Sequence, residues 1–150
     1  MSDKIFKHSL TPGLIIVLTK FGEAVAAKRE NKVHILRDLY FGPNDYSFKA
    51  NAQKLRLFGL IAHYRNSDGY FESGYWLLTS RGAKFLRNKL PINRTVSTLN
   101  NSVVSRDIAL VFISDVWKEY RLHGEKFQGL WLGELTEAAV EPQLTLSLNI

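Results

Sequence analysis

Cysteine is absent from this sequence of 150 residues. Without thiols the chain has no disulfide bond, no thiolate metal site and no cysteine nucleophile. Proline and glycine are also scarce, with four and ten residues, while hydrophobic residues make up 45%. A chain of this composition can bury a real core, so we expect a folded domain with an appendage rather than disorder. The missing cysteines fit a reducing, cytoplasmic compartment.

Long hydrophobic runs are absent as well. The longest uninterrupted runs, residues 14–18 and 108–113, are far shorter than the roughly 20 residues that a membrane span needs. The first residues contain no apolar stretch followed by a small-residue cleavage site, so we expect no secretory signal. A membrane is therefore not an expected partner.

The sequence also lacks the residue patterns of enzyme active sites. The four histidines are scattered, and none has a second histidine or a carboxylate at metal-ligand spacing. Asp115 and Glu119 would share a face if their segment is helical, but solvated like charges explain this pair better than a nuclease site. No glycine-rich phosphate loop is recognisable. We therefore predict no enzyme activity, no catalytic residue, no metal site and no cofactor.

Positive charge is concentrated in the first two thirds of the chain. Residues 1–100 contain sixteen Lys and Arg against seven Asp and Glu, whereas residues 101–150 contain four against seven. Basic side chains that neutralise phosphates release counterions, and this supplies most non-specific affinity for nucleic acids. A solvated basic surface is an equally weighted alternative when charge alone is considered.

Two helices are predicted near the N-terminus. Thr11 and Pro12 form a helix start, because a hydroxyl can cap the first turn and proline suits its first position. An apolar stripe with helical spacing then continues to about residue 29. The stripe comprises Leu14, Leu18, Phe21 and Val25. Asn31 is predicted to cap a second helix, which Gly42 and Pro43 end. Its expected inward residues are Val33, Leu36 and either Leu39 or Tyr40.

A third helix is predicted over about residues 46–58, before Gly59 ends it. At about 100° per residue, one face of this helix is apolar and the other is polar or small. The inward positions are Phe48, Ala52 and Leu55. The outward positions are Ser47, Ala50, Gln53, Lys54 and Leu57, with Lys49 and Arg56 on the flanks. Leu57 has packing against the next element as an alternative.

The character of the sequence then changes to strands. Residues 60–65 and 70–79 are rich in β-branched and aromatic side chains and flank residues 66–69, which have the composition of a hairpin turn. We expect the aromatic residues of the second strand to alternate, with one side capping the core and the other partly exposed. These are Tyr70, Phe71, Tyr75 and Trp76. Stacking on bases, as in single-strand binders, is the alternative. A short helix over residues 83–88 should return Phe85 and Leu86 to the core.

The remaining residues predict further strands. Residues 95–99 and 102–106 are joined by Asn100 and Asn101, which tolerate positive φ in a tight turn. Residues 108–113 continue as a buried strand or a helix start, and periodicity alone does not decide between them. Residues 143–150 alternate between apolar and polar, as in an edge strand or in a dimer contact by strand addition.

Taken together, the elements predict an α+β fold over residues 1–90, with three helices plus a β-hairpin wing in a winged helix-turn-helix arrangement. Residues 91–150 would form a small β-containing C-terminal extension that packs on the first part or mediates dimerisation. In this arrangement the third helix is the recognition helix, and the hairpin at about residues 62–78 is the wing.

The polar face of the third helix predicts roles in DNA binding. Gln53 can pair with adenine, Lys54 can reach guanine acceptors, and the small Ala50 permits close approach to the groove. Lys49 and Arg56 on the flanks would meet phosphates. Ser47 also lies on this outward face. At the tip of the wing, the expected contacts to the minor groove or backbone come from Arg65, Asn66 and Ser67.

Three stretches carry a resemblance to a protein family. Residues 51–61, residues 74–79 and the Leu-Thr-x-x-Gly-x-x-x-Leu run of residues 78–86 resemble an uncharacterised group of winged-helix proteins of phages and mobile elements. The last run is also similar to the strand-to-helix junction of regulators of the MarR group. The resemblance covers residues 12–118, since residues 113–117 look like the group's strand end. It implies a winged helix of mobile-element origin without an assigned activity, and some members carry a zinc knuckle whose cysteines this chain lacks.

The preferred hypothesis is a DNA-binding protein that regulates transcription as a homodimer on double-stranded DNA, because two recognition helices reinforce each other's affinity. The alternative is a protein-docking winged-helix module of phage or mobile-element origin that binds a host protein, since a fold does not fix a function. A continuous basic patch over the third helix and the wing would favour DNA. Acidic groups that interrupt this patch would favour docking.

Overall fold

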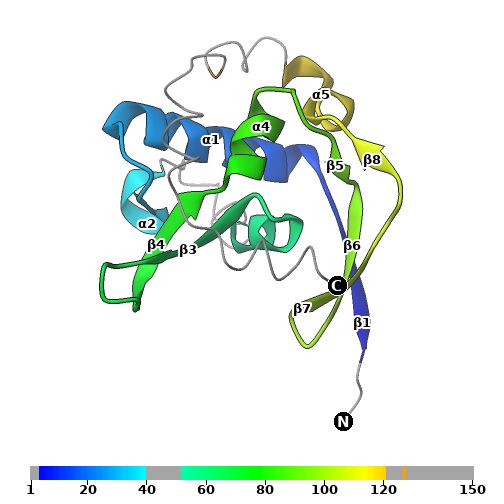
Figure 1. Cartoon of the computed structure of the whole chain (residues 1–150). Coiled ribbons are helices and arrows are strands. Elements are labelled where there is room, and N and C mark those ends of the chain that lie inside the picture. The colour runs from blue at the N-terminus through cyan, green and yellow to red at the C-terminus, as the bar shows by residue number, and fades with distance from the viewer. Residues whose placement is uncertain (1–3, 40–51, 121–126, 128–150) are drawn as a thin grey trace.

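The computed structural model describes residues 4–39, 52–120 and 127. Helices and small antiparallel sheets alternate along this part of the chain, which makes the fold α+β as predicted. Figure 1 shows the long helix α1, Pro12–Lys28, across the upper part of the molecule, with a hairpin below it at lower left and a second, three-stranded sheet at the right. The last predicted strand, residues 143–150, lies outside the described residues.

Helix α1, Pro12–Lys28, forms where the sequence predicts it. The Thr11 hydroxyl accepts a hydrogen bond from the Leu14 N–H at 3.2 Å and so caps the first turn. Arg29 ends the helix in the left-handed region with a φ of 53°. Ile15, Leu18 and Phe21 are fully buried, so one face of α1 forms the floor of the core.

The second predicted helix is shorter than predicted and begins after a two-residue strand. Strand β2, Val33–His34, pairs with the hairpin, and helix α2, Ile35–Asp38, follows directly. The ring nitrogen Nδ1 of His34 accepts from the N–H groups of residues 36 and 37, so the prediction of Asn31 as the cap is wrong. Because two extended residues shift the helical register, Ile35 is buried and Leu36, predicted to face inward, is 67% exposed.

The third predicted helix is described only from Ala52 onward. Here the chain forms the 3-10 helix η1, Gln53–Phe58, which Gly59 ends with a φ of 73°. Ala52 and Leu55 are buried as predicted, but Leu57 is also buried at 8% exposure. A 3-10 helix has about three residues per turn, which brings Leu57 closer to the buried side than α-helical geometry does. The outward placement of Leu57 is therefore wrong, and its inward alternative is the observed one.

The predicted hairpin is present. Strand β3, Ile61–Arg65, and strand β4, Phe71–Leu78, pair antiparallel from Ile61 opposite Leu78 onward. At the turn, the Asn66 carbonyl Oδ1 accepts from the N–H groups of residues 68 and 70. Strand β2 joins the free edge of β4, which gives a three-stranded sheet of order β2-β4-β3.

Helix α4, Ser80–Leu86, begins three residues before the predicted start. The Thr79 hydroxyl caps it by accepting from the Gly82 N–H at 2.9 Å. Asn88, expected inside the helix, has a φ of 57° and lies beyond its end. Phe85 and Leu86 are fully buried, as predicted.

A second sheet contains a strand that the sequence did not predict. Strand β1, Ile5–Ser9, pairs antiparallel with β6, Thr95–Leu99, and β6 pairs with β7, Ser102–Arg106. The β6–β7 hairpin was predicted, and its turn residues Asn100 and Asn101 have φ values of 51° and 66°.

The segment after β7 combines the two alternatives left open for residues 108–113. Strand β8, Leu110–Val111, pairs with β5, Ile92–Asn93, and helix α5, Ile113–Val116, follows before the 3-10 helix η2, Lys118–Tyr120. The expected burial is wrong for Ile108, which is 94% exposed. Because α5 ends at residue 116, Asp115 and Glu119 do not share a helix. Asp115 instead accepts from the Phe112 N–H at 2.8 Å.

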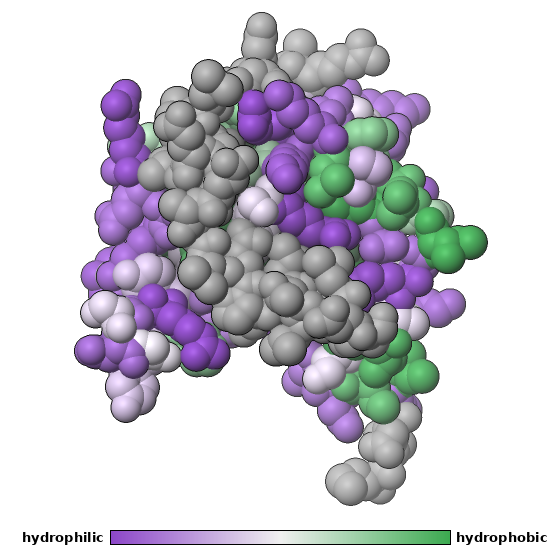
Figure 2. Space-filling model, viewed as in Figure 1, coloured by the Kyte–Doolittle hydropathy of each residue, from purple (hydrophilic) through white to green (hydrophobic). Residues whose placement is uncertain are grey.

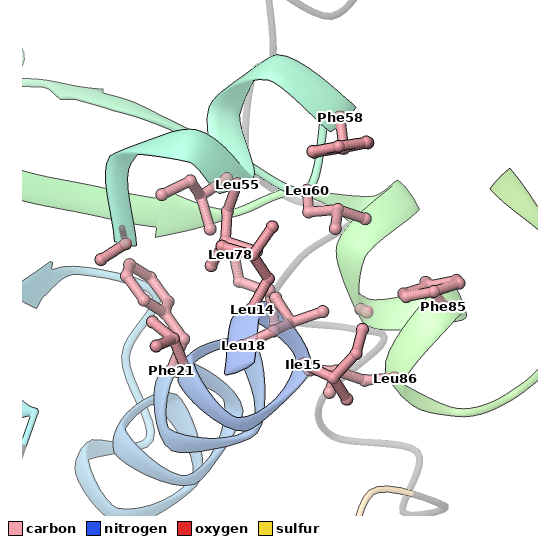
Figure 3. Packing of buried hydrophobic residues seen from close by; sticks show 14 of the residues in the cluster. Leu14, Ile15, Leu18, Phe21, Leu55, Phe58, Leu60, Leu78, Phe85 and Leu86 are labelled. Atoms are coloured by element: carbon pink, nitrogen blue, oxygen red, sulfur yellow. The ribbon is translucent and has the colours of Figure 1, made fainter. Parts of the chain in front are cut away.

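A single hydrophobic cluster connects most of these elements. Figure 3 shows side chains of α1, η1, the hairpin and α4 converging on one another. Four fully buried side chains from beyond residue 90 belong to the same cluster, namely Ile92, Val96, Ile113 and Phe127. The predicted division between residues 90 and 91 stays a prediction, although the two parts share this core.

Candidate functional site

The nine predicted contact residues fall into three groups. Ser47, Lys49 and Ala50 lie outside the described residues. Gln53, Lys54 and Arg56 lie on η1, and Arg65, Asn66 and Ser67 lie at the hairpin tip. In Figure 1, η1 (teal) lies between the hairpin and the sheet of β1, β6 and β7, so its polar side chains can reach both neighbours.

The polar side of η1 divides between those two neighbours. Gln53 and Lys54 are exposed, and Arg56 is half-buried. Burial, together with the positive charge of Lys54, lowers the pKa of His8 on β1. Burial, together with the charges of Arg56 and Arg65, lowers the pKa of His63 on β3. The positive charge of Lys54 therefore influences β1, whereas that of Arg56 influences the hairpin.

A row of cationic and aromatic side chains runs from η1 along the hairpin. The His63 ring stacks on Trp76 with centroids 3.9 Å apart and lies 5.1 Å from the ring of Phe71. The Arg65 guanidinium lies 4.2 Å from the centroid of Phe71. We call Arg56, His63, Phe71 and Arg65 the arginine strip. Hairpin register could have placed His63 opposite Trp76 from the sequence, but the neighbouring Arg56 depends on tertiary packing.

The aromatic residues of the second hairpin strand do not alternate as predicted, because the neighbours Tyr70 and Phe71 are both exposed. Trp76 is buried at 5% exposure, while Tyr70 and Phe71 are 73% and 51% exposed. The two exposed rings lie near the wing tip, and the Arg65 guanidinium packs over that of Phe71. In the view of Figure 2, hydrophilic side chains dominate over the hairpin at lower left, and hydrophobic ones gather over β8 and the start of β1.

At the tip itself, the predicted residues have different duties. Asn66 uses its side-chain oxygen to hold the turn, as described above, so this oxygen is not free to accept from a base. Arg65 donates to the Gly69 carbonyl at 3.3 Å while its guanidinium covers Phe71. Ser67 and the acidic Asp68 are exposed. Arg65 and Ser67 therefore remain the stronger candidates for contacts.

A second cluster, on the other face of the hairpin, was not predicted from the sequence. The Lys32 ammonium lies 4.6 Å and 4.7 Å from the ring centroids of Tyr64 and Tyr75. It also forms a salt bridge of 2.9 Å with Glu72. This hydrogen bond raises the pKa of Lys32, and burial partly opposes the effect. Because side chains alternate along a strand, Tyr64 and Tyr75 lie on the other face of the sheet from His63 and Trp76. Glu72 is paired with Lys32 beside these tyrosines, so its carboxylate does not interrupt the arginine strip.

Two structural features are absent from the described part of the chain. No group of three or more His, Asp or Glu side chains there could hold a metal ion. Within the same residues, none of the helices combines the length and the apolar character that crossing a membrane requires.

Comparison with known proteins found no match for this chain. No protein-family model matches the sequence, and no curated protein or solved structure matches it significantly. The resemblance to winged-helix proteins of phages and mobile elements therefore stays an expectation from the sequence. The functional argument depends on the geometry of η1 and the hairpin.

Proposed function

We propose that this chain is a winged helix-turn-helix protein that binds double-stranded DNA, with η1 directed toward the bases and the β3–β4 hairpin acting as the wing. The order of elements supports this proposal. Helix α1 is followed by β2, α2, η1 and the hairpin, the hairpin joins β2 in a sheet of order β2-β4-β3, and η1 contacts β3. A polar helix surface next to a projecting hairpin is a shape that can follow a DNA groove and its flanking backbone.

The arginine strip is the observation that carries the proposal. Its two arginines lie at either end of the row, and both charged groups that act on His63 are these arginines. The nearby carboxylate of Glu72 is paired with Lys32 on the opposite face. Two guanidinium groups on one side of the hairpin, with the uncharged rings of His63 and Phe71 between them, favour a polyanion over an uncharged protein partner.

The residues then divide by role. Arg56 and Arg65 neutralise backbone phosphates, which position the protein but carry no sequence information. Gln53 is exposed on η1 and has the amide geometry that pairs with adenine in the major groove. Ser67 at the tip can donate its hydroxyl proton to a backbone phosphate oxygen.

We further propose that the protein regulates transcription as a homodimer in the cytoplasm and has no catalytic activity of its own. A symmetric dimer places two weak reading surfaces on one site and multiplies their affinity. Exposed apolar side chains on and beside β8 supply a surface for such a contact, and Ile108 and Leu110 are 94% and 56% exposed.

The test is a titration with random-sequence duplex DNA at about 50 mM and about 200 mM salt. Each phosphate contact contributes about 0.9 to the slope of log affinity against log salt, so Arg56→Ala with Arg65→Ala should lower this slope by about 1.8. The matched control replaces two exposed lysines outside the strip, Lys84 and Lys89, with alanine and should change the salt slope less. Sedimentation velocity on the same samples measures the oligomeric state.

No duplex binding at the lower salt concentration would contradict the proposal and favour docking on a host protein. An equal loss of slope in the control variant would show diffuse charge attraction rather than a site on the strip. If duplex binding is found, Gln53→Ala should reduce the difference in affinity between the preferred DNA sequence and random DNA sequences.

A further inference from the structure

An open groove of about 380 Å³ lies between β1 and η1, on the side of η1 away from the hairpin. Strand β1 contributes Lys7 and His8, and η1 contributes Lys54 from the far side. The complete lining is Lys7, His8, Ser9, Thr11, Leu14 and Lys54. We call it the β1–η1 groove. Its described lining contains two lysines and no carboxylate.

The fold brings these side chains together from distant parts of the sequence. Pairing of β1 with β6 places His8 opposite Val96, and the His8 Nε2 atom lies 3.1 Å from the Thr98 hydroxyl. Thr98 is buried at 3% exposure, so this contact anchors β1 to the body of the protein. Both Lys7 and Lys54 are exposed and can move their ammonium groups toward a ligand in the groove.

The electrostatics of the groove favour an oxyanion. Burial and the positive charge of Lys54 both lower the pKa of His8, so this ring is held neutral while the two lysines carry charge. Thr11, at the start of the 17-residue helix α1, lines the same groove. The positive end of the α1 dipole therefore adds to the field of the lysines.

We infer that the β1–η1 groove binds a phosphate group of the DNA backbone, held between the ammonium groups of Lys7 and Lys54. This inference rests on the proposed function. It extends the DNA-contacting surface from η1 to β1, which lies on the other side of η1 from the hairpin. It also reassigns Lys54, which the sequence suggested as a reader of guanine, to the positioning of the backbone. On this arrangement η1 lies between two phosphate contacts, the β1–η1 groove and the arginine strip.

The first arm of the test measures duplex binding of Lys7→Ala with Lys54→Ala. Two lost phosphate contacts should lower the salt slope by about 1.8 and weaken binding at low salt about tenfold. The variant with Lys84→Ala and Lys89→Ala removes the same charge elsewhere and is the control. Circular dichroism and thermal midpoints verify that both variants remain folded.

The second arm titrates inorganic phosphate into the protein while NMR follows the ring protons of His8. A phosphate beside His8 should raise the pKa of this ring in the wild type and leave it unchanged in the Lys7→Ala, Lys54→Ala variant. This arm tests the groove for a phosphate oxyanion without relying on DNA.

The outcomes are distinguishable. Wild-type duplex binding that the Lys7→Ala, Lys54→Ala variant retains in full, with an unchanged salt slope, would overturn the inference and leave the proposed function intact. A response of His8 to inorganic phosphate without any duplex binding would overturn the assignment to DNA and identify free phosphate as the ligand. A reduced slope in the groove variant alone, together with the His8 response, supports the inference.

Discussion

Asn31 is a single side chain that completes the edge of a sheet. Its amide nitrogen donates to the Leu78 carbonyl at 2.7 Å, and its carbonyl oxygen accepts from the Leu78 N–H at 2.7 Å. The two bonds imitate the pairing that a neighbouring strand would give at the end of β4. The loop after α1 is thereby fixed to the hairpin 47 residues further along the chain.

Replacing Asn31 by alanine leaves the backbone N–H and carbonyl of Leu78 without these hydrogen-bond partners. We expect Asn31→Ala to lower the free energy of unfolding by about 2–3 kcal/mol, because each unsatisfied group costs on the order of 1 kcal/mol or more. Urea denaturation followed by tryptophan fluorescence measures the change. Asn31→Asp keeps the acceptor but loses the donor. Its free energy of unfolding should lie between those of the wild type and Asn31→Ala. An unchanged midpoint for Asn31→Ala would show that water replaces the amide without loss.

At the scale of elements, α2 is a four-residue helix held by one carboxylate. Asp38 accepts from the His34 N–H at 2.7 Å and from the Lys28 ammonium at 2.8 Å. Burial alone would raise the pKa of Asp38, but these two hydrogen bonds and the lysine charge outweigh it, so the pKa is lowered. A group with a lowered folded pKa stabilises the fold above its unfolded pKa and loses this effect as the pH falls.

The stability of the protein should therefore carry an acid-sensitive contribution from Asp38. It is complete above the ordinary carboxyl pKa of 3.8 and is lost as the pH falls through the lower folded pKa. Asp38→Asn should cost about 1 kcal/mol at pH near 6 and reduce the drop in thermal midpoint on acidification. Asp68→Asn at the exposed wing tip is the control. Parallel curves for Asp38→Asn and the wild type would refute this role of Asp38.

Comparison of the elements shows what local sequence can and cannot specify. Helix α1 and the two β-hairpins were predicted because their caps and turns depend on adjacent residues such as Thr11, Asn66 and Asn100. Strands β1 and β2 were missed because their short extended segments are stabilised by partners far along the chain. The site behaves in the same way: the exposure of Gln53 and Lys54 was predicted from periodicity, but the groove that Lys54 shares with Lys7 was not.

At the scale of the whole molecule, one core holds together the part of the chain that the structure describes. Helix α1 contacts the hairpin, η1, α4 and α5, and β1 joins the start of the chain to β6. Ile92, Val96, Ile113 and Phe127 are at most 1% exposed within the same cluster. Burial of four such side chains contributes on the order of 6–12 kcal/mol, which is comparable to the roughly 5–15 kcal/mol by which a typical protein is stable.

A fragment of residues 1–90 should therefore fail to fold on its own, even though it contains α1, η1 and the hairpin. Without β6, strand β1 loses its partner, and without Ile92, Val96 and Ile113 the face of α1 is partly uncovered. We expect the fragment to lack a cooperative thermal transition by circular dichroism, whereas the full chain unfolds in a single transition. Val96→Ala in the full chain should lower its stability by about 1–3 kcal/mol without splitting that transition. A fragment that unfolds cooperatively with the midpoint of the full chain would instead establish residues 1–90 as an independent domain.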